Sequence, residues 1–409
     1  MSKKKFKSRN LSQQHLAQAQ HRNRYWEKIH FICQACGAPQ AFSLLPRREL
    51  ERLYDLRFLP FRIEAAPGES IPERVVKDCR ILVFEQVKRQ AMPIVPGGPE
   101  ITLDDYFNVA LSLRHYLKII AVGEFPGAGE FKQALAIYAG DDGLLNEAFA
   151  RLSNVLWVPS VFCSDLNVRL YWLTLSFNRL DGDSCLQRNL EVHAHAPERV
   201  RAVFDGIPRP ASRACWAFCG SGIVKAVLQP SQLGVRGSFA DLPHEVFVQS
   251  HALQRLEERI DGVPTGLLHY SLFQSLQQPK AINDGQGNIL VEYRIFNAKA
   301  GYLIADIKDG RVVIRTFLFV TNNGTPEGKR LEEVCGLGRL DKQYLALDKL
   351  STFMAADVAG NAGLQELFRQ AGCECLWDLK EKVGPLCTVS GQAPAALLEQ
   401  YLGLKAKQL

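Results

Sequence analysis

The chain has 409 residues, of which 47% are hydrophobic and 22% are charged, and its net charge is +6. This composition is typical of a globular protein with two to three domains, whose core needs neither disulfides nor metals for stability. It argues against two classes of protein. Apolar runs such as Ile314–Val320 are too short to cross a membrane, and the 11 cysteines are scattered and odd in number, unlike a secreted disulfide framework. We therefore expect a cytoplasmic protein with reduced thiols and no membrane partner.

The positive charge is concentrated near the N-terminus. Residues 1–60 hold 12 Lys or Arg against 4 Asp or Glu. We expect residues 1–28 to form a loosely ordered basic arm that has no secretory leader, because no apolar stretch follows the basic start. One interpretation is a contact with RNA or the ribosome, and the other is a solvated tail. The predicted nucleic-acid contacts are Lys3, Lys4, Lys5, Lys7 and Arg9.

Cys33 and Cys36 form one CxxC pair directly after this arm. A structural zinc site needs two more ligands, and no second pair in the chain has the same spacing. Zinc binding through Cys33 and Cys36 is one hypothesis, and two simple thiols without any cofactor is the other.

Residues 29–242 are expected to form one or more mixed α/β domains of unknown type. Arg80–Val87 resembles a strand, and Thr102–Ile120 is typical of a helix capped by Thr102 or Asp104. Two further strands are predicted at Leu170–Phe177 and Asn189–His195. Pro197–Phe204 is predicted to be a short helix, since Pro stands at its start and Gly206 follows its end.

Residues 243–336 have the pattern of a small separate domain. Glu245–Ser250 reads as a strand, and the next residues, SHALQRLEERIDG, form an amphipathic helix. A second helix follows Pro264. Three strands come next, of which the last two form a hairpin around Asp309-Gly310. A helix capped by Thr325 is predicted after the strands, and residues 337–409 are expected to be helical. The fold class predicted for the whole chain is multi-domain α+β.

The helix that begins at His251 carries the pattern on which a chemical hypothesis rests. Its polar residues His251, Arg255, Glu258 and Arg259 are spaced so that they share one side of the helix. This S-H-A-x-x-R-x-x-E-R helix, within a strand-helix-helix-strand-strand-strand order, resembles the small BrnT-like members of the RelE/ParE-like toxin superfamily. The resemblance covers about 75 to 90 residues of the chain.

The resemblance implies a toxin-like domain that cleaves RNA without a metal. In that superfamily basic residues stabilise the phosphorane and an acid/base pair moves protons. By position, these roles fall on His251, Arg255, Glu258 and Arg259. Arg294 and Arg315, on the predicted strands, are added by analogy. Histidine has a pKa suited to proton transfer near neutral pH, and arginine binds phosphate oxygens in a fixed geometry.

Two other interpretations of this domain stay open. In the first, Arg255 and Arg259 pair with Glu258 and nearby acids, and they simply fix the helix on the sheet. In the second, the whole domain is a packing module of a non-enzymatic interaction or scaffold protein with a protein partner.

Overall fold

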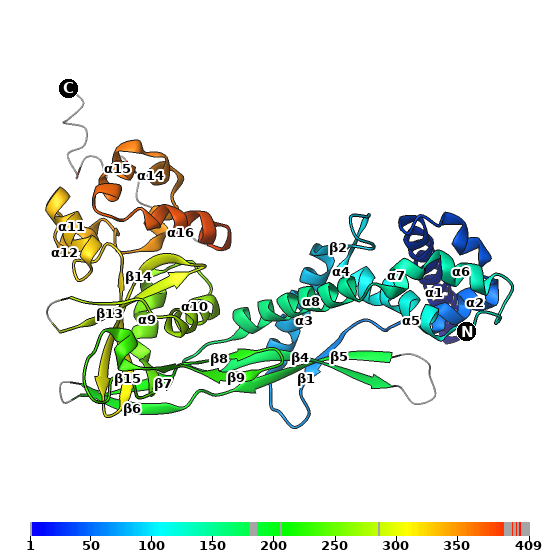
Figure 1. Cartoon of the computed structure of the whole chain (residues 1–409), viewed down its shortest axis with the longest axis horizontal. Helices are drawn as coiled ribbons and strands as arrows, with labels where there is room; N and C mark the ends of the chain where they lie inside the picture. The colour runs from blue at the N-terminus through cyan, green and yellow to red at the C-terminus, as the bar shows by residue number, and fades with distance from the viewer. Residues whose placement is uncertain are drawn as a thin grey trace. The chain divides into compact units, whose positions relative to one another are not determined.

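The structure is a computed structural model that describes residues 2–179, 186–204, 207–284 and 287–387, and residues 395, 398 and 401. The chain divides into two compact units. The first comprises Met1–Pro159 and Trp172–His193, and the second comprises Ser160–Tyr171 and Ala194–Leu409. Both contain helices and sheets, which confirms the multi-domain α+β fold class (Figure 1).

The first unit is mainly helical and begins with a long helix. Its elements, in chain order, are α1 Ser2–Ala35, η1 Pro39–Leu44, α2 Arg47–Asp55, β1 Arg62–Ala65, α3 Glu73–Arg89, β2 Ala91–Pro93, β3 Glu100–Thr102, α4 Leu103–Asp105, η2 Tyr106–Ala110, α5 Leu111–Ile119, α6 Ala128–Ala134, α7 Ala136–Gly140, α8 Asp142–Cys163, β4 Leu170–Arg179 and β5 Leu186–His195. The last residues of α8 and the first of β4 fall in the second unit. Residues 2–28 of the predicted basic arm are part of helix α1.

Two predictions in this unit have opposite outcomes. Thr102 caps the predicted helix, and its Oγ1 accepts a hydrogen bond from the Asp105 amide at 3.1 Å. The predicted strand Arg80–Val87 is wrong, because this segment is the second half of helix α3. Cys79, Val83 and Val87 are its buried residues, and their four-residue spacing is that of a helix face.

The second unit is built on one large sheet. Its elements are β6 Arg199–Phe204, β7 Ile207–Arg213, β8 Cys215–Phe218, β9 Gly222–Lys225, β10 Val227–Leu228, η3 Pro230–Leu233, β11 His244–Gln249, α9 Ser250–Arg259, α10 Thr265–Gln277, β12 Ala281–Asn283, β13 Ile289–Ile295, β14 Ala298–Lys308, β15 Arg311–Phe319, α11 Pro326–Cys335, α12 Arg339–Tyr344, α13 Leu350–Met354, α14 Ala356–Gly360, α15 Ala362–Gln370, α16 Cys375–Val383 and η4 Gly384–Leu386.

The large sheet has eight strands in the order β12-β13-β14-β15-β11-β7-β6, with β10 paired to β11. Strands β11 and β15 run parallel, and the other pairs in this sheet are antiparallel. The predicted order from strand Glu245–Ser250 through two helices to three strands is therefore present, with the short β12 added. The predicted helix Pro197–Phe204 is wrong, because Arg199–Phe204 is strand β6 and pairs with β7.

Helices α9 and α10 lie against one face of the sheet, where α9 contacts β15 and β11 and α10 contacts β13 (Figure 1). Val246 and Ile314 are fully buried on this face. Residues with the opposite orientation, such as Phe247 and Val313, form a second apolar cluster with Ala211. Strand β15 therefore lies inside the sheet, between β14 and β11, and carries apolar residues on both faces.

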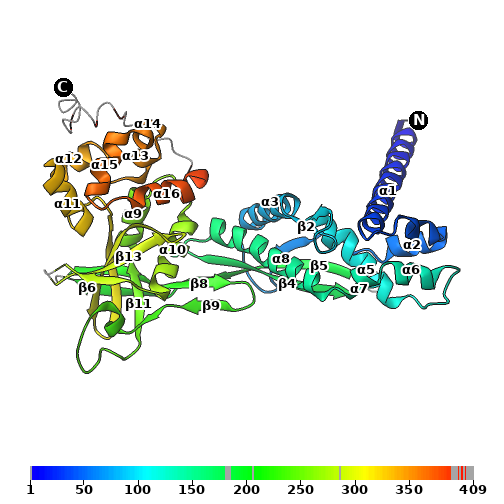
Figure 2. The same cartoon turned by 45° about the horizontal axis from the view of Figure 1, so that its top comes forward.

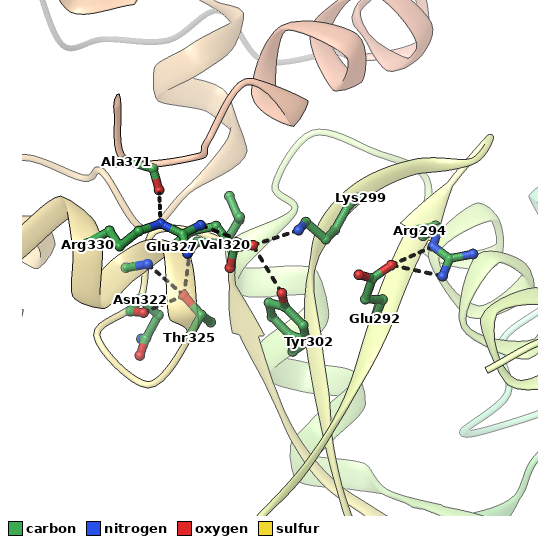
Figure 3. Close-up of polar contacts among 11 residues, drawn as sticks. Glu292, Arg294, Lys299, Tyr302, Val320, Asn322, Thr325, Glu327, Arg330 and Ala371 are labelled. Atoms are coloured by element: carbon green, nitrogen blue, oxygen red, sulfur yellow. Dashed lines mark hydrogen bonds and ion pairs between the residues drawn. The ribbon is translucent and has the colours of Figure 1, made fainter. Parts of the chain in front are cut away.

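Helices α11 to α16 gather near one end of β13 and β14 (Figures 1 and 2). The predicted N-cap is present, since the Thr325 hydroxyl accepts from the Gly328 amide at 3.0 Å. The first turn of α11 carries Glu327, a residue that is only 4% exposed. It accepts from Lys299 at 2.6 Å and from the Tyr302 hydroxyl at 3.1 Å, which ties α11 to β14 (Figure 3).

Most residues beyond 387 in the predicted helical region 337–409 lie outside the described residues. Across the part of the chain that the structure describes, no helix combines the length and the apolar character needed to span a membrane.

Candidate functional site

The junction between β11 and α9 carries the polar residues Gln249 and His251. Strand β11 ends at Gln249, α9 begins at Ser250, and His251 is therefore in the first turn of the helix. The parallel register pairs Val248 with Ile314. Gln249 and Arg315 directly follow this pair on their two strands.

A cavity of about 420 Å³ opens at this junction. Its lining comes from six segments: β7, the β11–α9 junction, the β12–β13 connection, β14, β15 and the turn after β15. The polar residues that matter for chemistry are Arg209, Gln249, His251, Asp284, Asn288 and Arg315. Of the six predicted catalytic residues, the cavity thus brings together His251 and Arg315.

His251 is held in its neutral form by its surroundings. Partial burial lowers the pKa of its imidazole, and the neighbouring cations Arg255 and Arg209 lower it further, against a weaker opposite effect of Glu258. The pKa therefore lies below the ordinary value of 6.5. An unprotonated imidazole at neutral pH can accept a proton.

The two arginines of the cavity differ in how they are held. The Arg315 Nε lies 2.8 Å from an Asp306 carboxylate oxygen, and its Nη2 donates to the Asn288 side-chain oxygen at 3.1 Å. The Arg209 side chain is exposed and forms no ion pair or hydrogen bond within the described ranges. Arg315 is thus a fixed cation, whereas Arg209 is a cation available to a ligand.

The side-chain amide of Gln249 is a buried hydrogen-bond donor. Its side chain is 1% exposed, and its Nε2 has no hydrogen-bond partner among the described residues. A buried amide without a partner costs about 1–3 kcal/mol.

The other four predicted catalytic residues lie elsewhere. Arg255 and Glu258 pair with each other at 2.7 Å on the half-exposed side of α9. Arg259 forms an ion pair with Asp348, whose side chain is 4% exposed. Arg294 donates twice to Glu292, at 3.0 and 2.8 Å (Figure 3), and it lines a separate cavity of about 270 Å³.

Sequence reasoning missed Arg209 and Gln249. Gln249 carries a local signal, because it is a polar residue at the end of the otherwise apolar strand β11. Arg209 carries none, because its strand reaches the cavity only through the long-range pairing of β7 with β11.

Cys33 lies in the last turn of α1, and Cys36 directly follows the helix. Burial raises the pKa of Cys33 to about 12 and that of Cys36 to about 11, so both thiols stay protonated at neutral pH. A metal ion would have to displace these protons. The described residues contain no group of three or more His, Cys, Asp or Glu side chains placed to hold a metal.

Helix α1 contains the predicted nucleic-acid contacts Lys3, Lys4, Lys5, Lys7 and Arg9. The structure describes the backbone of these residues, and their side chains lie outside its described part.

Comparisons of the chain with models of protein families, with curated proteins and with solved structures found no match.

Proposed function

We propose that the cavity at the β11–α9 junction binds RNA and cleaves its phosphodiester backbone without a metal. One observation carries this proposal: His251, whose surroundings favour its neutral form, lines the same cavity of about 420 Å³ as Arg209 and Arg315. A proton acceptor and two cations are the groups that cleavage by the 2′-hydroxyl needs. We place this activity in the cytoplasm, in keeping with the free thiols of the described cysteines.

In the proposed reaction, the 2′-oxygen attacks the adjacent phosphorus while the bond from phosphorus to the 5′-oxygen breaks. The imidazole of His251 takes the proton of the 2′-hydroxyl, and water supplies a proton to the leaving 5′-oxygen. The products are a 2′,3′-cyclic phosphate and a 5′-hydroxyl. Arg209 and Arg315 stabilise the extra negative charge of the phosphorane.

Arg209 extends the proposal to RNA binding. Its guanidinium is exposed and forms no ion pair or hydrogen bond among the described residues, so it donates to a phosphate oxygen of the bound RNA. This contact does not depend on catalysis, so we expect a catalytically impaired variant to keep its affinity for RNA.

The test is cleavage of single-stranded RNA by the full chain in the presence of EDTA, with His251→Ala and Arg294→Ala compared in parallel. We expect His251→Ala to lower the cleavage rate constant by about 10²–10⁴-fold, since it removes the proton acceptor. Arg294→Ala is the matched control, because Arg294 lines a different cavity and we expect it to leave the rate unchanged. Equal rates for all three proteins would contradict the catalytic proposal.

A second candidate is an interaction module in which the helix motif has only a packing role. The pairs Arg255–Glu258 and Arg259–Asp348 support it, because they engage three of the four motif residues away from the cavity. This candidate predicts that RNA neither binds nor is cleaved, even at low ionic strength where phosphate contacts are strongest.

A further inference from the structure

A second cavity, of about 270 Å³, lies in the first unit, apart from the proposed RNA site. Helix α1 forms one wall, and the segment that follows α2, helix α4 and η2 form the others. Its lining is rich in basic side chains: His21, Arg24 and Lys28 from α1 and Arg57 from the segment after α2.

The α1 residues share one side of the helix because their spacings are three and four residues. Lys28 is neutralised by an ion pair with Asp105. Arg57 stacks over the Tyr54 ring at 3.9 Å and donates to the Tyr54 carbonyl oxygen at 2.7 Å, and no carboxylate is paired with it among the described residues. The exposed Arg24 has no ion pair or hydrogen bond in the part of the chain that is described.

The pKa of His21 depends on the charges of these cations. Burial lowers the pKa of its imidazole, and Arg57, Lys28 and Arg24 each lower it further. The charges of Arg57, Lys28 and Arg24, which come from two segments of the cavity lining, thus act together on His21, whose ring bonds to the Tyr54 hydroxyl at 2.8 Å.

A fourth cation lies directly behind the cavity wall. Arg188 is 0% exposed, and its guanidinium donates to the Leu59 carbonyl oxygen and to the side-chain oxygen of Asn108, a residue of the lining. Its Nη1 has no hydrogen-bond partner within the described ranges. Burial lowers the pKa of Arg188 to about 9, opposed only by Asp104. A buried guanidinium without its own carboxylate is costly, and a nearby anion reduces that cost.

The cavity and the residue behind it thus hold four cations, Arg24, Lys28, Arg57 and Arg188, against two carboxylates, Asp104 and Asp105. The apolar lining residues Phe58 and Val109 lie beside them. The geometry points to a binding site for a phosphate group, held by Arg24 and Arg57, on a ligand that also presents an apolar or aromatic part. A free nucleotide and the backbone of RNA both have this chemistry.

The experiment is calorimetric titration of the full chain at low ionic strength with three probes: inorganic phosphate, AMP and a ten-nucleotide single-stranded RNA. Each titration uses the parent protein, Arg24→Gln and Arg22→Gln. Arg22 is the matched control, because it belongs to the same helix but pairs with Glu51 at 2.8 Å. All proteins carry Arg209→Gln and Arg315→Gln as well, so that the cavity of the second unit contributes no cation and a failure of the proposed function leaves this result unaffected.

We expect Arg24→Gln to weaken binding of the phosphate-bearing probes about tenfold or more, and Arg22→Gln to leave it within about twofold. Binding of AMP and phosphate supports a nucleotide as the source of the group, whereas binding of RNA alone supports its backbone. Absence of binding for every probe would overturn the site, as would equal weakening by Arg22→Gln. Because Arg24 is exposed and unpaired, its replacement leaves folding intact, which the thermal midpoint of each variant checks.

Discussion

The two ends of helix α9 differ in what their polar residues do. At the N-terminal end, His251 borders an open cavity with Arg209 and Arg315. At the C-terminal end, Arg259 pairs with the buried Asp348, and Asp261 accepts from both the amide and the hydroxyl of Ser351. One end borders a cavity, and the other is fastened to the start of helix α13 and the residues before it.

This difference shows that a short motif on one helix does not have to act as one site. Residues four apart share a side of a helix, but ten residues of α9 extend about 15 Å. The two ends therefore meet different parts of the sheet and of the C-terminal region, and their substitutions should separate activity from stability.

The largest expected effect is on stability, at the fastened end. Arg259→Ala leaves the buried carboxylate of Asp348 without its partner, and we expect a loss of about 3–5 kcal/mol in the free energy of unfolding. Urea denaturation of the full chain measures it. If Arg259→Ala instead unfolds at the same urea concentration as the parent, the ion pair does not hold this end of the helix.

A second expected effect falls on RNA affinity and leaves stability alone. Arg209→Gln removes the unpaired cation of the cavity, and we expect it to weaken RNA binding about tenfold to a hundredfold. Fluorescence anisotropy with a labelled RNA measures the affinity, and the urea midpoint should not move. Unchanged affinity would remove Arg209 from the site.

The third expectation concerns pH. Because burial and the cations Arg255 and Arg209 lower the pKa of His251 below 6.5, cleavage should rise about tenfold per pH unit in acid and be level at neutral pH. Removal of a cation in Arg209→Gln should move the midpoint of this profile to higher pH. A profile that is still rising above pH 7 would show that another group takes the proton.

The smallest expected effect is that of Arg255→Ala. Its partner Glu258 is half-exposed, and an exposed pair of this kind on a helix contributes about 0.3–0.5 kcal/mol. We expect a loss of stability in that range and, because Arg255 lowers the pKa of His251, a small upward shift of the pH profile. A loss comparable to that of Arg259→Ala would erase the contrast between the two ends.

Local patterns predicted those parts of the fold that local interactions decide. The Thr102 and Thr325 caps and the turn at Asp309-Gly310 are present where the sequence indicated them. Arg80–Val87 was mistaken for a strand because a short apolar run does not distinguish a strand from a buried helix. Residues 199–204 were mistaken for a helix because Pro197 and Gly206 match helix ends, whereas pairing with β7 makes them a strand.

The candidate site was harder to predict than the fold. His251 follows from the motif, and Arg315 was added by analogy. Arg209 is 42 residues away from His251 in the sequence and reaches it through the β7–β11 pairing, which no local pattern encodes. The partner that draws Arg259 away from the cavity, Asp348, is 89 residues away in the sequence and likewise appears only when the chain is folded. Glu292, by contrast, stands two residues before its partner Arg294 on the same strand.

The position of β11 inside the eight-stranded sheet affects whether the segment 243–336 can be produced on its own. Strand β11 is hydrogen-bonded to β15 on one side and to β7 and β10 on the other. Excision at residue 243 would strip β11 of its second neighbour and expose a bare strand edge, which favours aggregation. It would also remove Arg209, so the excised piece would lose both its solubility and half of the cavity's positive charge.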